Sequence, residues 1–198
     1  MAKILALEGT PGAGKTSVII ELIKDDALTD SLRIPELNID LASEKSEDDL
    51  KISKLYLNAE IDKAKSVREA LNKYEYIVLD RTFLTTLAYS YALSKKKKKT
   101  QDYKNLMDYF KKLDRKYHFP RPNYLFYLTI PLTVSLARRA RFSHLEDFKN
   151  WFDLEFLKYF TDFYKKNFSE LKMPKPVFID TTNLNENALM HNIIKNLN

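Results

Sequence analysis

The sequence predicts an α/β fold in which a five-stranded parallel sheet lies between layers of helices. Three observations predict this class. Short apolar segments alternate with helical ones, all three glycines fall in one short run near the N-terminus, and polar residues follow each apolar segment. Short apolar runs between helices are typical of parallel strands buried on both faces. The length of 198 residues, without a Ser-, Gly- or Pro-rich linker, fits one domain, residues 1–198.

The first part of the chain starts this alternation. Lys3–Glu8 (KILALE) is mostly apolar and ends at the glycine run, which predicts a strand, and Thr16–Lys24 (TSVIIELIK) predicts the helix that follows. Leu32–Ile34 is a second, short apolar segment. Glu47–Lys73 has the periodicity of a long amphipathic helix. Tyr76–Asp80 (YIVLD) is an apolar run that ends on a carboxylate, and we expect the third strand there.

The second part of the chain continues the pattern. The expected strands are the apolar runs Tyr124–Leu128 (YLFYL) and Pro176–Asp180 (PVFID). The expected helices, each with helical periodicity, are Phe83–Ser94, Gln101–Tyr117, a segment from Leu132 into an arginine-rich turn, Phe148–Phe168 and Glu186–Asn196. The penultimate helix carries aromatic residues at i, i+4 spacing, namely Phe152, Phe156, Phe160 and Tyr164. Such a stripe indicates core packing against the sheet rather than a wall of a base-binding site.

The glycine run is a phosphate-binding loop by its pattern. The run LEGTPGAGKTS meets G-x-x-x-x-G-K-[ST] at Gly9, Gly14, Lys15 and Thr16. The backbone N–H groups of such a loop point inward, and the positive end of the following helix faces the anion. Lys15 is expected to reach the β- and γ-phosphates of ATP, and the Thr16 hydroxyl is expected to bind Mg²⁺. The loop residues expected at the nucleotide are Gly9, Thr10, Pro11, Gly12, Ala13, Gly14, Lys15, Thr16 and Ser17.

Polar residues also follow the other predicted strands, and ligands of parallel sheets bind at the carboxyl ends of the strands. They are Glu36, then Asp80 and Arg81, then Arg138, Arg139 and Arg141 beyond a helix, and finally Asp180, Thr181, Thr182 and Asn183. Asp80 is expected to hold Mg²⁺ together with Thr16, although its place before Phe83 also suits a helix cap. Arg81 is expected to orient the acceptor.

Composition limits the other classes of site. The chain has no cysteine and only three scattered histidines, which excludes disulfides, a thiol nucleophile and a zinc site. No apolar run is long enough to cross a membrane, and Met1 leads directly into the first strand without a signal peptide, so we expect a cytoplasmic protein. The net charge of +6 and the five lysines Lys95–Lys99 permit a nucleic-acid patch. A solvated loop at a helix C-terminus is the preferred interpretation, because no aromatic residues interleave with these lysines.

Several ordered motifs resemble the thymidylate kinase and deoxynucleoside kinase group of P-loop kinases. The run DRTFLTTLAY, Asp80–Tyr89, is similar to the thymidylate kinase segment in which Asp-Arg precedes a hydroxyl residue and Ala-Tyr. The segment PNYLFYLTIPLTVSLARR resembles the fourth strand and lid helix of the group, and IPEL, Ile34–Leu37, resembles the Pro-Glu motif of deoxynucleoside kinases. Two departures place the chain between the subfamilies: Pro11 stands where thymidylate kinases usually have Asp, and Asp80-Arg81-Thr82 replaces Glu-Arg-Ser.

The resemblance implies a P-loop kinase fold with an arginine-rich lid at about residues 138–147, in which Arg138 contacts ATP and Arg141 acts beside it. It also implies transfer of the γ-phosphoryl group of ATP, with Mg²⁺, to a nucleoside or a nucleoside monophosphate such as thymidine or dTMP. Glu36 is then the base for a nucleoside 5′-hydroxyl, whereas a monophosphate needs cations such as Arg33 and Arg81. A homodimer is implied as well. Two other functions stay open, a P-loop ATPase or switch that acts on a partner and a polynucleotide 5′-kinase that uses Lys95–Lys99.

Overall fold

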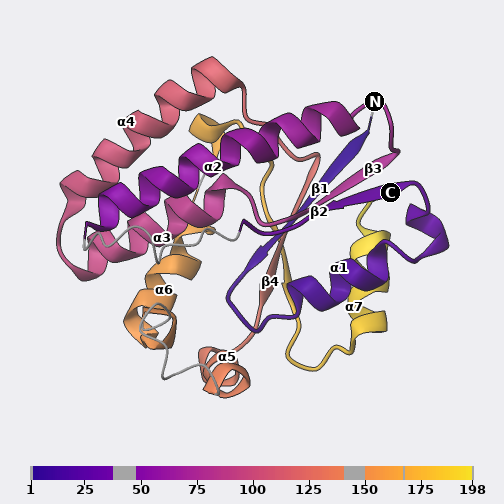
Figure 1. The fold of residues 1–198 in the computed structure, drawn as a ribbon. Coiled ribbons are helices and arrows are strands. Elements are labelled where there is room, and N and C mark those ends of the chain that lie inside the picture. Colours follow the sequence, from indigo (N-terminus) through magenta and orange to yellow (C-terminus); the bar gives the residue numbers. More distant parts are fainter. Residues whose placement is uncertain (1, 38–47, 141–149, 167, 198) are drawn as a thin grey trace.

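A parallel sheet forms the centre of the computed structural model, which describes residues 2–37, 48–140, 150–166 and 168–197 (Figure 1). The strands are β1 (Lys3–Gly9), β2 (Ser31–Ile34), β3 (Tyr76–Asp80), β4 (Tyr124–Thr129) and β5 (Val177–Asp180). Their order across the sheet is β2-β3-β1-β4-β5, and every neighbouring pair is parallel. The α/β class and the five expected strands are confirmed.

Helices cover both faces of the sheet, so the fold has three layers (Figure 1). The α-helices within the described residues are α1 (Lys15–Leu22), α2 (Asp49–Ala70), α3 (Phe83–Lys96), α4 (Thr100–Tyr117), α5 (Leu132–Arg139), α6 (Leu154–Phe163) and α7 (Glu186–Lys195). Short 3₁₀ turns lie at Asp26–Leu28 and Ser169–Leu171. Helices α1 and α7 pack on one face, and α2, α3, α4 and α6 lie on the other. None of the described helices is long and apolar enough to cross a membrane.

The two faces of the sheet bury separate apolar cores. Along β1, Ile4 and Ala6 point into the core shared with α2, α3, α4 and α6, whereas Leu5 and Leu7 point into the core under α1 and α7. Side chains alternate between faces along a strand, so the apolar run of β1 supplies both cores. The chain leaves β1 toward α1 on one face and leaves β3 toward α3 on the other. A crevice between such diverging connections is where α/β sheets bind ligands.

Two predicted helices were too long. Helix α2 starts after its N-cap Asp48, whose carboxylate accepts hydrogen bonds from the N–H groups of Leu50 and Lys51. The helix expected at 148–168 is observed only as α6, because the Asp153 carboxylate caps it by accepting from the Phe156 N–H at 2.8 Å. Residues 47, 148, 149 and 167 lie outside the described residues. Phe156, Phe160 and Tyr164 are buried in the core, as the aromatic stripe predicts.

Candidate functional site

The phosphate-binding loop joins β1 to α1, and its glycines have backbone conformations that other residues rarely adopt. Gly9, Gly12 and Gly14 have φ angles of 138°, 81° and 87°. A Cβ atom at Gly9 would lie 2.3 Å from the backbone oxygen of Leu128 in β4, so only glycine fits this close approach of two strands. Further bonds tie the loop to its surroundings, because the Pro11 carbonyl accepts from the Ser135 hydroxyl and the Ala13 carbonyl from the Thr181 hydroxyl.

Lys15 is folded back into this loop. Its Nζ atom donates to the carbonyl oxygens of Gly9, at 3.1 Å, and of Thr10, at 3.0 Å. Burial and, to a smaller extent, the positive charge of Arg81 together lower the pKa of Lys15 to about 7, against the opposing effect of nearby carboxylates. An anion at the loop would therefore favour the protonated form of Lys15, which is the property expected of a phosphate-binding lysine.

Thr16 and Asp80 meet where a magnesium ion is expected. Asp80 ends β3 and pairs with Leu7 of β1, and Thr16 lies in the first turn of α1, which follows β1 and the loop. The Thr16 hydroxyl donates to Asp80 Oδ2 at 3.0 Å, while Asp80 Oδ1 is buried and has no hydrogen-bond partner among the residues that the structure describes. Arg33 lies 3.4 Å from Oδ2. Hard oxygen ligands with an unused carboxylate oxygen suit Mg²⁺, which is commonly bound by one or two protein groups, substrate phosphates and water.

Arg81 and Glu36 form an ion pair beside the loop. Arg81 Nε lies 2.5 Å from Glu36 Oε1, and Arg81 Nη1 donates to the Gly9 carbonyl at 3.2 Å and to the Thr85 hydroxyl at 3.3 Å. Burial alone lowers the pKa of Arg81, but the charges of Glu36 and Glu8 outweigh it and raise the pKa above its ordinary value. The Arg81 side chain is almost fully buried, whereas that of Glu36 is 49% exposed. The pair thus fixes a carboxylate at the surface of the site.

Lys15, Thr16, Glu36 and Arg81 line one cleft of about 690 Å³ at the carboxyl end of the sheet. One end is the loop from Pro11 to Ser17 with Glu36 and Arg81, and the other end is the connection from β5 to α7. The lining residues outside the loop are Glu36, Arg81, Arg138, Thr181, Leu184, Asn185, Glu186 and Leu189. A polar end with phosphate-binding features and a partly apolar end match the two parts of a nucleotide.

Comparison with known proteins identifies the family. The profile of the AAA domain family matches residues 4–126, which contain β1, the loop, α1 and the strands β2 and β3. The chain belongs to this AAA domain family. A comparison with curated protein sequences gave no significant match.

Solved structures similar to this AAA domain protein cover almost the whole chain. A deoxyadenosine kinase from M. mycoides with the products dCMP and dCDP bound matches with a TM-score of 0.70 and 17% identity over 98% of both chains. The same kinase with bound dATP matches with a TM-score of 0.70 and 18% identity over 98% of both chains. Thymidylate kinase from Candida albicans matches with a TM-score of 0.74 and 16% identity over 99% of this chain and 91% of that chain. The P-loop kinase fold implied by the motifs is confirmed.

The arginines expected in the lid lie in different environments in this AAA domain protein. Arg138 Nη1 donates to the Gly12 carbonyl at 2.9 Å, which places its side chain at the loop. Arg139 instead turns back onto its own helix, bonds Ser135 at 3.0 and 2.9 Å and lies over the ring of Phe152. Burial lowers the pKa of Arg139. Arg141 and most of the expected lid, residues 141–147, lie outside the described residues.

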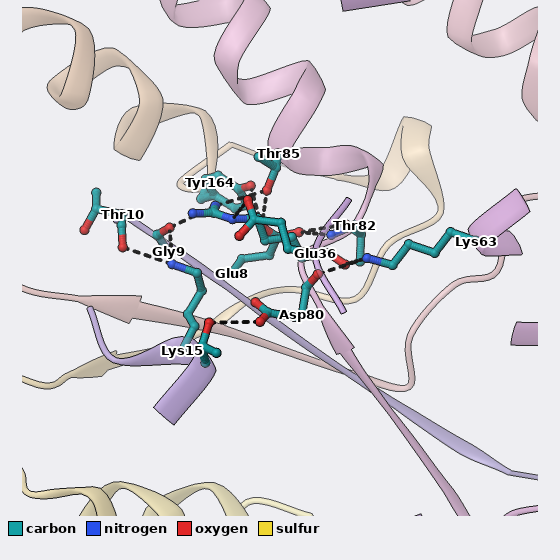
Figure 2. A network of polar contacts seen from close by, with 12 residues as sticks. Glu8, Gly9, Thr10, Lys15, Glu36, Lys63, Asp80, Thr82, Thr85 and Tyr164 are labelled. Carbon is teal, nitrogen blue, oxygen red and sulfur yellow. Dashed lines mark hydrogen bonds and ion pairs between the residues drawn. The ribbon is translucent and has the colours of Figure 1, made fainter. Parts of the chain in front are cut away.

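Glu8 is a buried carboxylate that the sequence analysis treated only as the end of an apolar strand. It is fully buried beneath the loop of this AAA domain protein and accepts four hydrogen bonds (Figure 2). Oε1 accepts from the N–H and the hydroxyl of Thr82, both at 2.8 Å, and Oε2 accepts from the hydroxyls of Thr85 at 2.6 Å and Tyr164 at 3.0 Å. These bonds tie β1 to the start of α3 and the end of α6. The sequence feature that could have indicated this buried role is a carboxylate within an otherwise apolar strand.

A second pair of buried charges comes from α2. Lys63 Nζ donates to the carbonyl oxygens of Asp80 at 2.9 Å and Arg81 at 2.8 Å, as Figure 2 shows. Glu60 lies one turn earlier on the helix, and burial raises its pKa to about 7 against the opposing charge of Lys63. Burial lowers the pKa of Lys63. Both residues fall near the apolar stripe of Leu57, Ala64 and Val67, and charges at such positions were the signal for an interior role.

Proposed function

We propose that this AAA domain protein is a magnesium-dependent kinase that transfers the γ-phosphoryl group of ATP to the 5′-hydroxyl of a deoxynucleoside. The observation that carries the proposal is the ion pair between Glu36 and Arg81 at 2.5 Å, in the cleft that contains the phosphate-binding loop. Arg81 is buried and paired, and Glu36 presents a carboxylate to the cleft. A hydroxyl acceptor requires a base in this place, whereas an anionic acceptor is repelled by a carboxylate.

The chemistry follows from the positions of the side chains. Glu36 accepts the proton of the 5′-hydroxyl as its oxygen attacks the γ-phosphorus, the bond from that phosphorus to the β,γ-bridging oxygen breaks, and ADP leaves. Lys15 and Arg138 lie at the loop and stabilise the charge that develops on the transferred group. Thr16 and Asp80 would hold Mg²⁺, which would supply positive charge to the phosphate groups. The end of the cleft near Leu184 and Leu189 would take the adenine base.

The similar structures support the same substrate class. A deoxyadenosine kinase and a thymidylate kinase share this fold, and the deoxyadenosine kinase was solved with dCMP and dCDP and with dATP bound. A nucleoside monophosphate such as dTMP is therefore the second candidate acceptor. Arg33, which is partly exposed and 3.4 Å from Asp80, is the cation that favours it. We also propose a homodimer, on the motif resemblance, and sedimentation of the purified chain tests it.

The proposal is tested by measuring ADP formation from Mg·ATP with each deoxynucleoside and each monophosphate as acceptor. We expect turnover that depends on a deoxynucleoside. Steady ATP hydrolysis that no acceptor changes would instead identify an ATPase or switch. Phosphorylation of DNA 5′-ends would identify a polynucleotide kinase, which needs free lysines. Lys96 and Lys97, however, pair with Asp153 and Asp49.

The Glu36→Gln variant separates the two acceptor classes, because it keeps the shape of the side chain and removes its basicity. With a nucleoside, kcat should fall by roughly 10² to 10⁴ with little change in ATP affinity, as expected for loss of a general base. With a monophosphate, kcat should stay nearly constant, and Arg81→Ala should raise the acceptor KM. Wild-type turnover of Glu36→Gln on a nucleoside would refute the role of Glu36.

A further inference from the structure

Asp80 and Arg81 are consecutive residues, yet their side chains serve two different parts of the site. The Asp80 carboxylate accepts from Thr16 on α1, whereas the Arg81 guanidinium reaches Glu36 and the Gly9 carbonyl. The backbone makes this divergence possible by a sharp change of direction, since Arg81 has a φ angle of 64°. A residue with a side chain in this left-handed conformation carries a cost of roughly 1–2 kcal/mol. Other contacts must therefore offset this free-energy cost and stabilise the turn at Arg81.

Each backbone polar group of this turn has a partner. The Arg81 N–H donates to the Leu7 carbonyl at 3.1 Å, and the Thr82 N–H donates to Glu8 at 2.8 Å. The carbonyls of Asp80 and Arg81 both accept from Lys63 Nζ, at 2.9 and 2.8 Å. Strand β1 thus holds the N–H groups, and a single ammonium from α2 holds both carbonyls. Two carbonyls bound to one atom cannot rotate independently, so this ammonium fixes the direction of the chain at Arg81.

We propose that Lys63 is a positioning residue for phosphoryl transfer, which sets the metal-binding carboxylate of Asp80 and the Glu36-orienting guanidinium of Arg81 at the same time. The inference rests on the proposed kinase function. Lys63 is only 6% exposed and is absent from the lining of the cleft, so it acts through the turn and not on the substrate.

A role in packing alone does not explain a lysine here. Burial of a charged group is unfavourable, and replacement of a buried ion pair by apolar residues of similar size is often neutral or stabilising. Lys63 brings Glu60 with it as a buried counter-charge. Apart from the pair itself and Thr82, the small cavity beside them, about 20 Å³, is lined by apolar residues such as Val67 and Phe83. The fold has room and neighbours for an apolar residue, whereas the two carbonyls require a donor.

The test compares three single variants. Lys63→Met keeps the length of the side chain without a donor, Lys63→Arg keeps the charge and donors, and Lys65→Met removes an exposed lysine of the same helix as a matched control. Lys63→Met should lower kcat by about 10- to 100-fold and raise the Mg²⁺ concentration for half-maximal activity by about tenfold, as for loss of a supporting metal-site contact. The ATP KM should change little, because the loop is intact. Lys63→Arg should restore most of the wild-type kcat and most of the wild-type Mg²⁺ requirement, and Lys65→Met should match the wild type in both quantities.

A purely structural role would lower thermal stability without moving the magnesium requirement. If Lys63→Met does not fold, the double variant Glu60→Gln/Lys63→Met, which leaves no uncompensated buried charge, takes its place. Wild-type kcat and magnesium requirement in either folded variant would overturn the proposal, and so would an unchanged magnesium requirement combined with reduced stability alone.

Calorimetry of ATP binding with and without Mg²⁺, in the absence of any acceptor, separates this proposal from the kinase function. If the wild type phosphorylates no nucleoside, the proposed function fails, but the contribution of Mg²⁺ to ATP affinity still reports the placement of Asp80. We expect Lys63→Met to reduce that contribution by about tenfold while the affinity for metal-free ATP is unchanged. An equal contribution of Mg²⁺ in Lys63→Met and in the wild type would refute the positioning role.

Discussion

Substitution of Gly9 by alanine should destabilise the protein much more than the same substitution at Gly14, although both glycines belong to the phosphate-binding loop. Both have positive φ angles, 138° and 87°. The added Cβ at Gly9 would lie 2.3 Å from the Leu128 oxygen and 3.1 Å from its nitrogen. Among the described residues, no heavy atom beyond the chain neighbours of Gly14 lies within 4 Å of the added Cβ there. The two positions therefore differ mainly in space and not in the sign of φ.

The two costs can be estimated separately. The positive φ alone disfavours alanine by roughly 1–2 kcal/mol, and this is the whole effect expected on the free energy of unfolding at Gly14. At Gly9 the clash is with the backbone of β4, which has no rotamer to change, so β1 and β4 must move apart. Overpacking of this kind adds about 1–3 kcal/mol, and the total for Gly9→Ala is about 2–5 kcal/mol.

Urea denaturation followed by circular dichroism measures both variants against the wild type. A functional readout accompanies it, because the Gly9 carbonyl accepts from both Lys15 and Arg81, so displacement of Gly9 moves two cations of the site. ATP affinity should fall in Gly9→Ala even under conditions where the variant is fully folded. Equal unfolding free energies for Gly9→Ala and Gly14→Ala would show that the close approach of β1 and β4 does not explain the glycine.

Three further predictions follow from the site. Lys15→Ala should lower the transfer rate by at least about 10² without loss of the fold, because Lys15 contacts loop carbonyls and not the core; a near-normal rate at saturating ATP would contradict this. Asp80→Ala should change the Mg²⁺ dependence of activity, and a magnesium titration identical to that of the wild type would count against its metal role. Burial raises the pKa of Glu60 from 4.5 to about 7, so its contribution to stability is present below pH 4.5 and is lost as pH rises through 7. Between pH 5 and pH 8, the free energy of unfolding of Glu60→Gln should therefore rise by up to about 3 kcal/mol relative to that of the wild type. A difference in unfolding free energy that does not change with pH would refute this.

The sequence predicted the sheet well because its signals are local. Parallel strands buried on both faces are continuous apolar runs, and such runs stood at the central strands β1, β3 and β4. The edge strands β2 and β5 are shorter and more exposed, and their apolar residues gave a weaker signal. The loop pattern depends on residues within eight positions, and Asp80 and Arg81 followed an obvious strand. Helix ends were predicted less well, because one side chain decides them. The aromatic stripe around Phe156 continued the helical pattern past Asp153, which caps α6 and starts it later.

The supporting residues of the site could not be predicted, because their partners are distant in the chain. Glu8 and Tyr164 are hydrogen-bonded across 156 positions, and each belongs to a pattern that already had an apolar explanation. Lys63 reaches backbone carbonyls, which carry no sequence signal at all. Arg139 follows Arg138, but one helical step of about 100° directs its guanidinium to Ser135 of its own helix, whereas that of Arg138 donates to the Gly12 carbonyl. Local sequence patterns predicted the helices and strands, whereas the contacts between them depend on how distant parts of the chain pack together.

The buried cluster around the loop contains both acidic and basic side chains, and their mutual effects indicate how the site accommodates a polyphosphate. Arg81 on one side and Glu8, Glu36 and Asp80 on the other act in opposite directions on the pKa of Lys15. A bound polyphosphate adds negative charge to this largely buried cluster, which is unfavourable unless cations or protons arrive with it. The lowered pKa of Lys15 lets it take up a proton when phosphates bind, and Asp80 Oδ1, which has no hydrogen-bond partner among the described residues, offers a place for Mg²⁺. Arg138, exposed at the mouth of the cleft, is able to exchange the Gly12 carbonyl for phosphate oxygens. Part of the positive charge therefore arrives only when the anion binds, so the empty site avoids an excess of buried cations.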